Sequence, residues 1–187
     1  MNHAVATVIS RVFDPFIMLG IFLALTFVRG GVGGLYVWIS AFILMIAAPA
    51  LCIFWAIKRH IVDNWDISKR SQRPLVLVVL LIIESISVAV LAEFVSAWVT
   101  YMLLLVLGVL LGFAIVTLRW KMSGHALASA LTTGVIVAWY GVSWWPVLLV
   151  VPIVAWARVV RRDHTIGQVI VGALYSWVVV AASSLFL

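Results

Sequence analysis

Three short polar motifs carry the residue types that could do chemistry in this sequence. They are Arg73-Pro74, then Ser123-Gly124-His125, then Arg158 with His164 six positions later. Arginine forks match phosphate oxygens bidentately, and the backbone N–H groups at a Ser-Gly turn that opens a helix are further donors. One histidine can attack phosphorus while the other protonates the leaving oxygen. The set therefore favours phosphate-ester chemistry that needs no metal ion.

Each motif alone is a weak signal. A Ser-Gly-His tripeptide occurs by chance in many chains, and a single interfacial histidine is more often a packing residue than a catalytic one. The prediction depends on the three motifs occurring together. It therefore requires helices that place all three motifs at the same membrane surface.

Those elements are expected to be membrane spans. The chain has 187 residues, of which 66% are apolar and 10% charged, whereas a soluble domain is about half apolar and a quarter charged. A bilayer crossing takes about 20 apolar residues. We therefore expect an all-α, multi-pass transmembrane helical bundle with six to seven spans, forming one integral-membrane domain over residues 1–187 with its motif-bearing core at about 58–187.

The apolar stretches give the expected positions of the spans. An interfacial helix at the N-terminus leads into a first span that ends at Val28, with Pro15 at an early helical position. The region Ala126–Val160 is too long for one crossing, and Gly141 and Pro146 divide it into two. The remaining spans are expected at about Leu35–Ile57, Leu75–Ala92, Phe94–Leu118 and Thr165–Leu187, with Lys58–Pro74 as an interfacial helix or ordered loop.

The charge pattern identifies the expected partners. The net charge is +6, and the cations lie in short loops beside the spans. This placement favours a lipid bilayer and a phosphate-bearing membrane lipid over nucleic acid. The single cysteine, Cys52, lies in an apolar run and is expected to be a packing residue.

Together the motifs resemble those of the type 2 phosphatidic acid phosphatase family, the membrane lipid phosphatase branch of the phosphatase and vanadium-haloperoxidase superfamily. The family pattern is a lysine, six residues and Arg-Pro; later Pro-Ser-Gly-His; later Ser-Arg, five residues, His, three residues and Asp. This chain has DISKRSQRP at 66–74, MSGH at 122–125 and ARVVRRDHTIGQ at 157–168. The His-Thr-x-x-Gln-Val stretch is similar to that of dolichyl-diphosphatase-like members, in which glutamine is the usual residue.

The chain departs from the family pattern at four positions. The motif lysine falls on Asp66, the proline on Met122, the serine before the second arginine on Ala157 and the final aspartate on Gln168. Asp66 could pair with Arg73 or Lys69 and orient the loop. Lys69, Arg70 or Lys121 could supply the missing positive charge.

The resemblance implies a role for each matching residue. His164 would be the nucleophile that forms a phosphohistidine, Gln168 would orient it by accepting its Nδ1–H, and His125 would be the general acid that later activates water. Arg73, Arg158, Ser123 and the Gly124 N–H would hold the phosphoryl oxygens, and Lys69 and Lys121 would add charge. No cofactor and no metal ion are expected.

The implied substrate is a lipid phosphate or diphosphate, with an isoprenoid (di)phosphate as the first choice. Phosphatidate and phosphatidylglycerophosphate are alternatives. A catalytically silent member that binds lipid as a scaffold is the rival from another class, motivated by Asp66 and Gln168. A transporter is less favoured, because the sequence has no internal repeat.

Four acidic residues have weaker interpretations. Glu84 lies mid-span, where an ionisable group is costly, and it is either a hydrogen-bonded structural residue or part of a lipid-tail cavity. Asp14, Asp66 and Asp163 suggest a metal site, but no spacing fixes their geometry. Asp163 directly precedes His164 and would point away from it on a continuous helix.

The loops predict the orientation in the cell membrane. With two spans between successive motifs, eleven of the twelve Lys and Arg residues fall on the motif side and only Arg29 falls opposite. The positive-inside rule therefore predicts that His125 and His164 face the cytoplasm, with Leu187 outside if there are seven spans. A cysteine at Lys69 in a Cys52→Ser background should resist an impermeant maleimide in intact cells. Labelling without permeabilisation would place the motifs outside.

Overall fold

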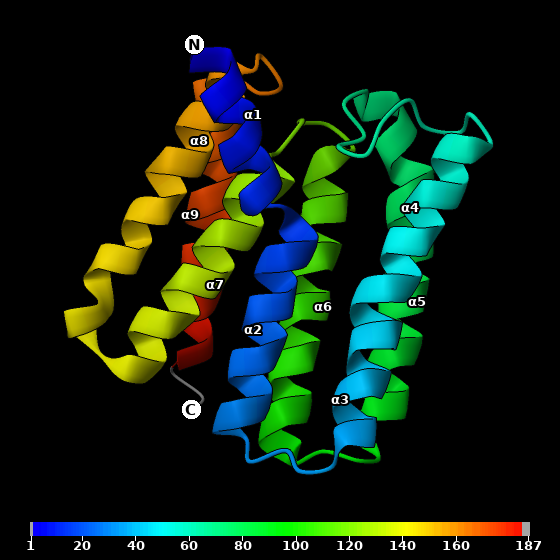
Figure 1. Cartoon of the computed structure of the whole chain (residues 1–187), viewed down its shortest axis with the longest axis vertical. Coiled ribbons are helices and arrows are strands. Elements are labelled where there is room, and N and C mark those ends of the chain that lie inside the picture. The colour runs from blue at the N-terminus through cyan, green and yellow to red at the C-terminus, as the bar shows by residue number, and fades with distance from the viewer. Residues whose placement is uncertain (1, 185–187) are drawn as a thin grey trace. The chain divides into compact units, whose positions relative to one another are not determined.

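The computed structural model describes residues 2–184, and every regular element in this range is a helix (Figure 1). Six helical stretches are long and apolar enough to cross a membrane: Asn2–Arg29, Leu35–Lys58, Arg70–Ala92, Ala97–Thr117, Val142–Val160 and Ile166–Ser183. Helices suit this environment because they satisfy their own backbone hydrogen bonds. The chain is a multi-span helical membrane protein, which confirms the predicted fold class. The end of the last predicted span, including Leu187, lies outside the described residues.

The chain divides into two compact units. The terminal unit combines the segment up to Phe22 with the segment from Trp120 onward, and the central unit is Leu23–Arg119. The boundary falls within helix α2 (Pro15–Arg29).

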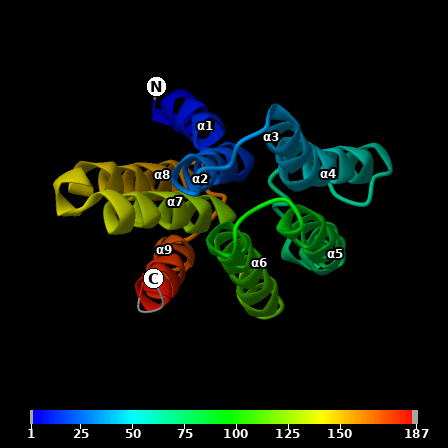
Figure 2. The same ribbon diagram turned by 90° about the horizontal axis from the view of Figure 1, so that it is seen from below.

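The central unit contains the end of α2 and three further long stretches. These are α3 (Leu35–Phe42), the π-helical turn η1 (Ile43–Ala47) and α4 (Ala48–Lys58); then η2 (Arg70–Gln72) and α5 (Arg73–Ala92); then α6 (Ala97–Thr117). Helices α5 and α6 pack together, and α5 also contacts α4 (Figure 2). The core includes Phe27, Met45, Leu91 and Leu103. The expected polar stretch after α4 is an ordered loop of turns that leads into η2.

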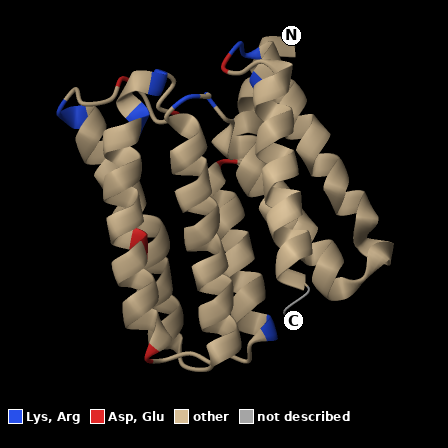
Figure 3. Ribbon diagram, turned by 180° about the vertical axis from the view of Figure 1, so that it is seen from behind, with Lys and Arg blue, Asp and Glu red and all other residues tan. Residues whose placement is uncertain are grey.

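Charge in the central unit gathers at the helix ends. Figure 3 shows a cluster of Lys and Arg where α4 ends and α5 begins. The intervening loop contains two non-glycine residues with a left-handed backbone, His60 with φ 57° and Ile67 with φ 45°. This conformation is unfavourable for a β-branched residue such as Ile67, so the surrounding loop must hold it there.

The terminal unit contains the remaining helices. They are α1 (Asn2–Val12), the start of α2, α7 (Gly124–Tyr140), η3 (Val142–Leu149), α8 (Val150–Val160) and α9 (Ile166–Ser183). Helix α7 packs against both α8 and α9, and α1 packs against α8 (Figure 2). The Ser176 hydroxyl of α9 donates to the Leu127 carbonyl of α7 at 2.8 Å. Hydroxyl-to-carbonyl bonds of this kind help to join helices where lipid surrounds them.

The predicted helix boundaries at Pro15 and Gly141 are confirmed. Helix α2 begins at Pro15, and the Asp14 carboxylate accepts the Phe16 N–H at 2.9 Å. Gly141 ends α7 with φ 96°, a backbone that glycine adopts without strain. Helix α7 has 17 residues, at the lower end of the length that crosses a bilayer. Helix α7 is therefore a seventh long helix in the described residues, in addition to the six candidate spans, and this number agrees with the predicted six to seven spans.

Gly172 controls how closely α9 approaches the start of α7. A Cβ atom at this position would lie 2.7 Å from the Ser123 carbonyl oxygen and 3.4 Å from the Leu127 nitrogen. Real Cβ atoms do not come this close to backbone, so only glycine permits the observed approach. The position of the second motif therefore depends on a glycine that none of the motifs contains.

We predict that Gly172→Ala destabilises the protein, because the new methyl group must push α9 away from α7. Overpacking of this kind costs about 1–3 kcal/mol. Gly20→Ala is the matched control, since nothing lies within 4 Å of its added Cβ. Reversible unfolding in mixed micelles would measure both, and equal stability of the two variants would contradict the close packing.

Candidate active site

The second motif forms the N-terminus of α7. Ser123 is the N-cap, and its buried Oγ accepts a hydrogen bond from the Ala126 N–H at 3.4 Å. The Gly124 N–H lies in the first turn, where no carbonyl of the same helix can accept it. Such amides and the helix dipole favour an anion. His125, also buried, follows in the same turn, so the motif presents a ring beside potential anion donors.

The third motif forms the end of α8 and the turn that follows it. Helix α8 stops at Val160, and Arg162 adopts a left-handed backbone with φ 60°. The N–H groups of Asp163 and His164 donate to the Arg158 carbonyl oxygen at 3.1 and 3.3 Å. The turn therefore returns to Arg158. The expectation that Asp163 points away from His164 assumed a continuous helix, and that premise is wrong because α8 ends at Val160.

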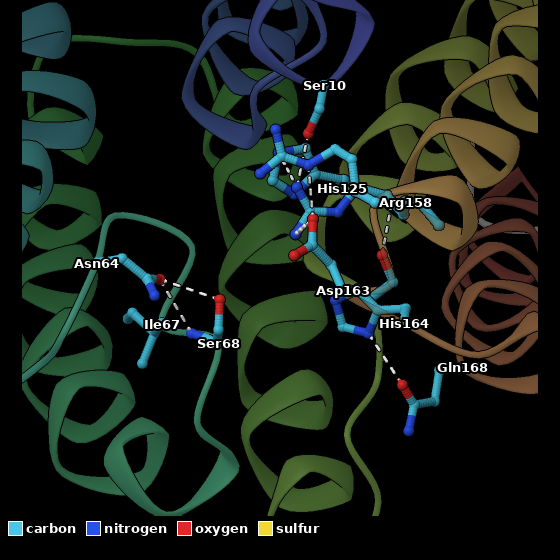
Figure 4. Close-up of polar contacts among 12 residues, drawn as sticks. Ser10, Asn64, Ile67, Ser68, His125, Arg158, Asp163, His164 and Gln168 are labelled. Carbon is cyan, nitrogen blue, oxygen red and sulfur yellow. Dashed lines mark hydrogen bonds and ion pairs between the residues drawn. The ribbon is translucent and has the colours of Figure 1, made fainter. Parts of the chain in front are cut away.

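Arg158 is the most buried charged residue of this turn, with 1% of its surface exposed. Its Nη1 donates to the Ser10 Oγ at 2.6 Å and lies 3.5 Å from the His125 Nε2 (Figure 4). Its Nη2 lies 3.3 Å from the Asp163 Oδ2. A guanidinium only donates hydrogen bonds, so the His125 Nε2 is the accepting atom here. Arg158 thus joins α1, α7 and the turn after α8 through one planar group.

His164 contacts Gln168, as the sequence predicts. The His164 Nδ1 lies 3.2 Å from the Gln168 Oε1, and this oxygen also accepts the Thr165 backbone N–H at 3.2 Å. An atom that accepts from a backbone N–H must be the amide oxygen, so the His164 Nδ1 must carry a hydrogen to bond it. In a neutral imidazole this leaves Nε2 unprotonated. The geometry suits a nucleophilic Nε2, although the catalytic role remains a prediction.

The same glutamine also starts α9. Thr165 is the N-cap, and its Oγ1 accepts the Gln168 N–H at 3.4 Å while the Gln168 side chain accepts the Thr165 N–H. This reciprocal capping box stabilises a helix N-terminus. The Gln168 carbonyl oxygen further accepts the Ser123 N–H at 3.2 Å. Gln168 consequently fixes the helix start, the His164 ring and the approach of α7 together.

Lys121 is positioned by a backbone contact. Its Nζ donates to the Asp163 carbonyl oxygen at 2.6 Å, so the ammonium lies beside the turn that carries His164. Arg161 reaches the same turn, since its Nε lies 2.7 Å from the Asp163 Oδ2. The terminal unit therefore brings together these predicted site residues: Ser123, Gly124, His125, Arg158, His164, Gln168 and Lys121.

The first motif lies in the central unit. Arg73 begins α5 and is 4% exposed, and its Nε donates to the carbonyl oxygen of Ile67 at 2.9 Å. Its guanidinium carbon lies 5.9 Å from the centre of the Phe113 ring, within the range of a cation–π contact. These contacts hold a buried guanidinium at the start of a membrane-spanning helix.

The other loop residues of this motif lie nearby in sequence but differ in environment. Lys69 is exposed and pairs with Asp63 at 2.7 Å, so its ion pair is with Asp63 rather than with Asp66. The Lys69 ammonium, together with the Gln72 amide, holds the pKa of Asp63 below its ordinary value. Asp66 lies at the end of the same loop, one residue before the left-handed Ile67. Lys69 as a phosphate ligand stays a prediction.

Glu84 lies in the middle of α5, far along the helix from Arg73. It is 4% exposed, and its Oε2 is buried without a hydrogen-bond partner in the described part of the chain. Ser87, one turn further on, has its Oγ 2.7 Å from the Ile83 carbonyl oxygen of its own helix and 3.2 Å from the Leu44 carbonyl oxygen in the π-helical turn. Glu84 therefore packs inside the central unit, and its assignment to a lipid cavity stays a prediction.

Three contributing residues were not found by motif reasoning. Ser10 is one, and no sequence signal marks it, because its partner Arg158 is remote in the chain. Asp163 is another, hidden by the assumption of a continuous helix. Thr165 could have been found, since Thr165-Ile-Gly-Gln168 has the spacing of a capping box.

Comparisons with protein families, with curated proteins and with solved structures find no match to this chain. The resemblance in the motifs is therefore a hypothesis about family, and the geometry of the terminal unit stands independently of it.

We predict that Gln168 sets the tautomer of His164. Gln168→Leu removes the acceptor for Nδ1–H and should give a mixture of imidazole tautomers, visible in the ¹⁵N shifts of histidine-labelled protein. Thr165→Val is the matched control, because it removes the other half of the capping box, worth about 1 kcal/mol, and leaves the Gln168 oxygen in place. A similar tautomer change in both variants would mean that helix capping alone orders the ring.

Proposed function

We propose that this protein is an integral-membrane lipid phosphatase that works through a phosphohistidine at His164. The observation that carries the proposal is the hydrogen bond from the His164 Nδ1 to the Gln168 Oε1 at 3.2 Å. It makes Nε2 the unprotonated nitrogen of a neutral ring. Close to the same turn, the buried Arg158 contacts the ring of His125, so a nucleophile, a cation and a second proton carrier share one unit.

The proposed reaction has two steps. The His164 Nε2 attacks phosphorus and forms an N–P bond, while the P–O bond to the lipid breaks and His125 transfers a proton to the leaving oxygen. Water then attacks the phosphohistidine, His125 accepts its proton, and the N–P bond breaks to release inorganic phosphate. Arg158 and the Gly124 N–H would stabilise the charge that spreads over the phosphoryl oxygens. For a diphosphate, the leaving oxygen belongs to the remaining phosphate.

The surroundings of these residues support a lipid as the substrate. The described chain consists of membrane-spanning helices with short connections, so it offers little soluble surface for a bulky polar headgroup. The glutamine at position 168 is the feature that favours an isoprenoid (di)phosphate, through its resemblance to dolichyl-diphosphatase-like proteins. Phosphatidate and phosphatidylglycerophosphate are the alternatives within the same reaction class. A role for Arg73 in binding the phosphoryl oxygens rests only on the resemblance of its motif to the phosphatidic acid phosphatase family.

We predict that the purified protein releases phosphate from a lipid phosphate in detergent with EDTA present. The panel contains isoprenoid mono- and diphosphate, phosphatidate and phosphatidylglycerophosphate, with the isoprenoid compounds hydrolysed fastest. His164→Ala should lower kcat by at least about a hundredfold, because it removes the imidazole that forms the proposed covalent bond. Lys58→Ala, at the exposed end of α4, should stay within about twofold of the unaltered protein.

Two results of this assay would contradict the proposal. Activity that requires an added divalent ion would move the charge stabilisation from Arg158 to a metal. No release from any substrate by folded protein would favour the lipid-binding scaffold.

A further inference from the structure

The carboxylate of Asp163 occupies the cationic side of the terminal-unit site. Its Oδ2 lies 3.3 Å from the Arg158 Nη2 and 2.7 Å from the Arg161 Nε (Figure 4). Its own backbone carbonyl accepts the Lys121 Nζ at 2.6 Å. Asp163 thus contacts three cations, two through its carboxylate and one through its backbone carbonyl.

The Arg158 end of this cluster differs from an ordinary surface ion pair. The Arg158 side chain is 1% exposed and the Asp163 side chain 17%. A buried guanidinium is costly without a counter-charge, and Nη1 is directed at Ser10 and His125. The Asp163 carboxylate therefore supplies a negative charge at Nη2, on the fork edge that would bind a phosphoryl oxygen.

A carboxylate oxygen and a phosphate oxygen accept the same charge-assisted hydrogen bond from arginine. A phosphate that approaches the Arg158 Nη2 therefore meets a position already taken by the Asp163 Oδ2. Asp163 is partly exposed and retains Arg161 as a partner, so it can release Arg158 without losing every cation.

We propose that Asp163 is a resident counter-anion that competes with the phosphate of the ligand for Arg158. It compensates Arg158 while the site is empty, and it lowers the affinity for inorganic phosphate, which favours release of product. The inference rests on the proposed function for the place of Arg158 in the site. It assigns to Asp163 a role in specificity and product release.

A purely structural role of Asp163 predicts the opposite change in phosphate affinity when its carboxylate is removed. If Asp163 only held Arg158 in position, its removal would misplace the guanidinium and weaken the binding of phosphate. If it competes, its removal should strengthen that binding, provided that the gain passes through Arg158. The direction of the change and its dependence on Arg158 therefore separate the two roles.

The test measures the binding of inorganic phosphate by calorimetry to the full-length protein in detergent. Asp163→Asn should bind phosphate about tenfold to a hundredfold more tightly, the scale of one hydrogen bond to a charged group. Glu93→Gln is the control, because it removes one negative charge at an exposed position at the end of α5, and it should leave the affinity unchanged. If the Asp163→Asn protein does not fold, as judged by its thermal unfolding midpoint, Asp163→Ser is used in its place.

A double-mutant cycle with Arg158→Lys, which keeps the charge and removes the fork, tests whether the gain passes through Arg158. The gain should disappear in the Arg158→Lys background. Unchanged or weaker binding by the Asp163 variants, a gain that persists without Arg158, or no phosphate binding by any variant would each overturn the inference. Arg158-dependent binding with no hydrolysis of lipid phosphates would instead refute the proposed phosphatase and leave the role of Asp163 intact.

Discussion

A guanidinium buried in a membrane protein is the constraint on which the terminal unit depends. Arg158 is almost completely removed from solvent, and a buried charge is costly unless partners compensate it. Those partners come from three places: Ser10 on α1, His125 on α7 and Asp163 in the turn after α8. Satisfying one arginine therefore assembles segments from both ends of the sequence.

The second constraint is the start of α9, where fold and chemistry use the same side chain. Gln168 closes the capping box with Thr165, orients the Nδ1 of His164, and through its carbonyl receives the N–H of Ser123. Gly172 admits this approach because it lacks a Cβ. A glutamine lacks the negative charge with which an aspartate would stabilise a protonated imidazole. It supplies instead a neutral hydrogen-bond acceptor, whose burial is less costly. The proposed nucleophile is consequently oriented by the interactions that begin its helix.

The sequence predicts the fold class and the contact between His164 and Gln168 because both depend on local rules. Hydropathy reveals spans. His164 directly precedes the N-cap Thr165 of α9, and the capping box turns the Gln168 side chain back toward it. The place of Asp163 could not be predicted, because it depends on where α8 ends and on a left-handed Arg162. Ser10 was also out of reach, because its bond to Arg158 joins positions far apart in the chain. Motifs predict which residues are candidates for the site, whereas tertiary packing determines which carboxylates and hydroxyls contact them.

The central claim is that His164 forms a covalent bond to phosphorus. Rapid acid-free quenching of the protein with a ³²P-labelled lipid phosphate, followed by peptide mapping, tests it most directly. The account predicts an alkali-stable, acid-labile phosphoramidate on the peptide that contains His164, formed at least as fast as phosphate is released. It predicts no label in the His164→Ala protein. Steady release of phosphate with no label on His164 would contradict the account.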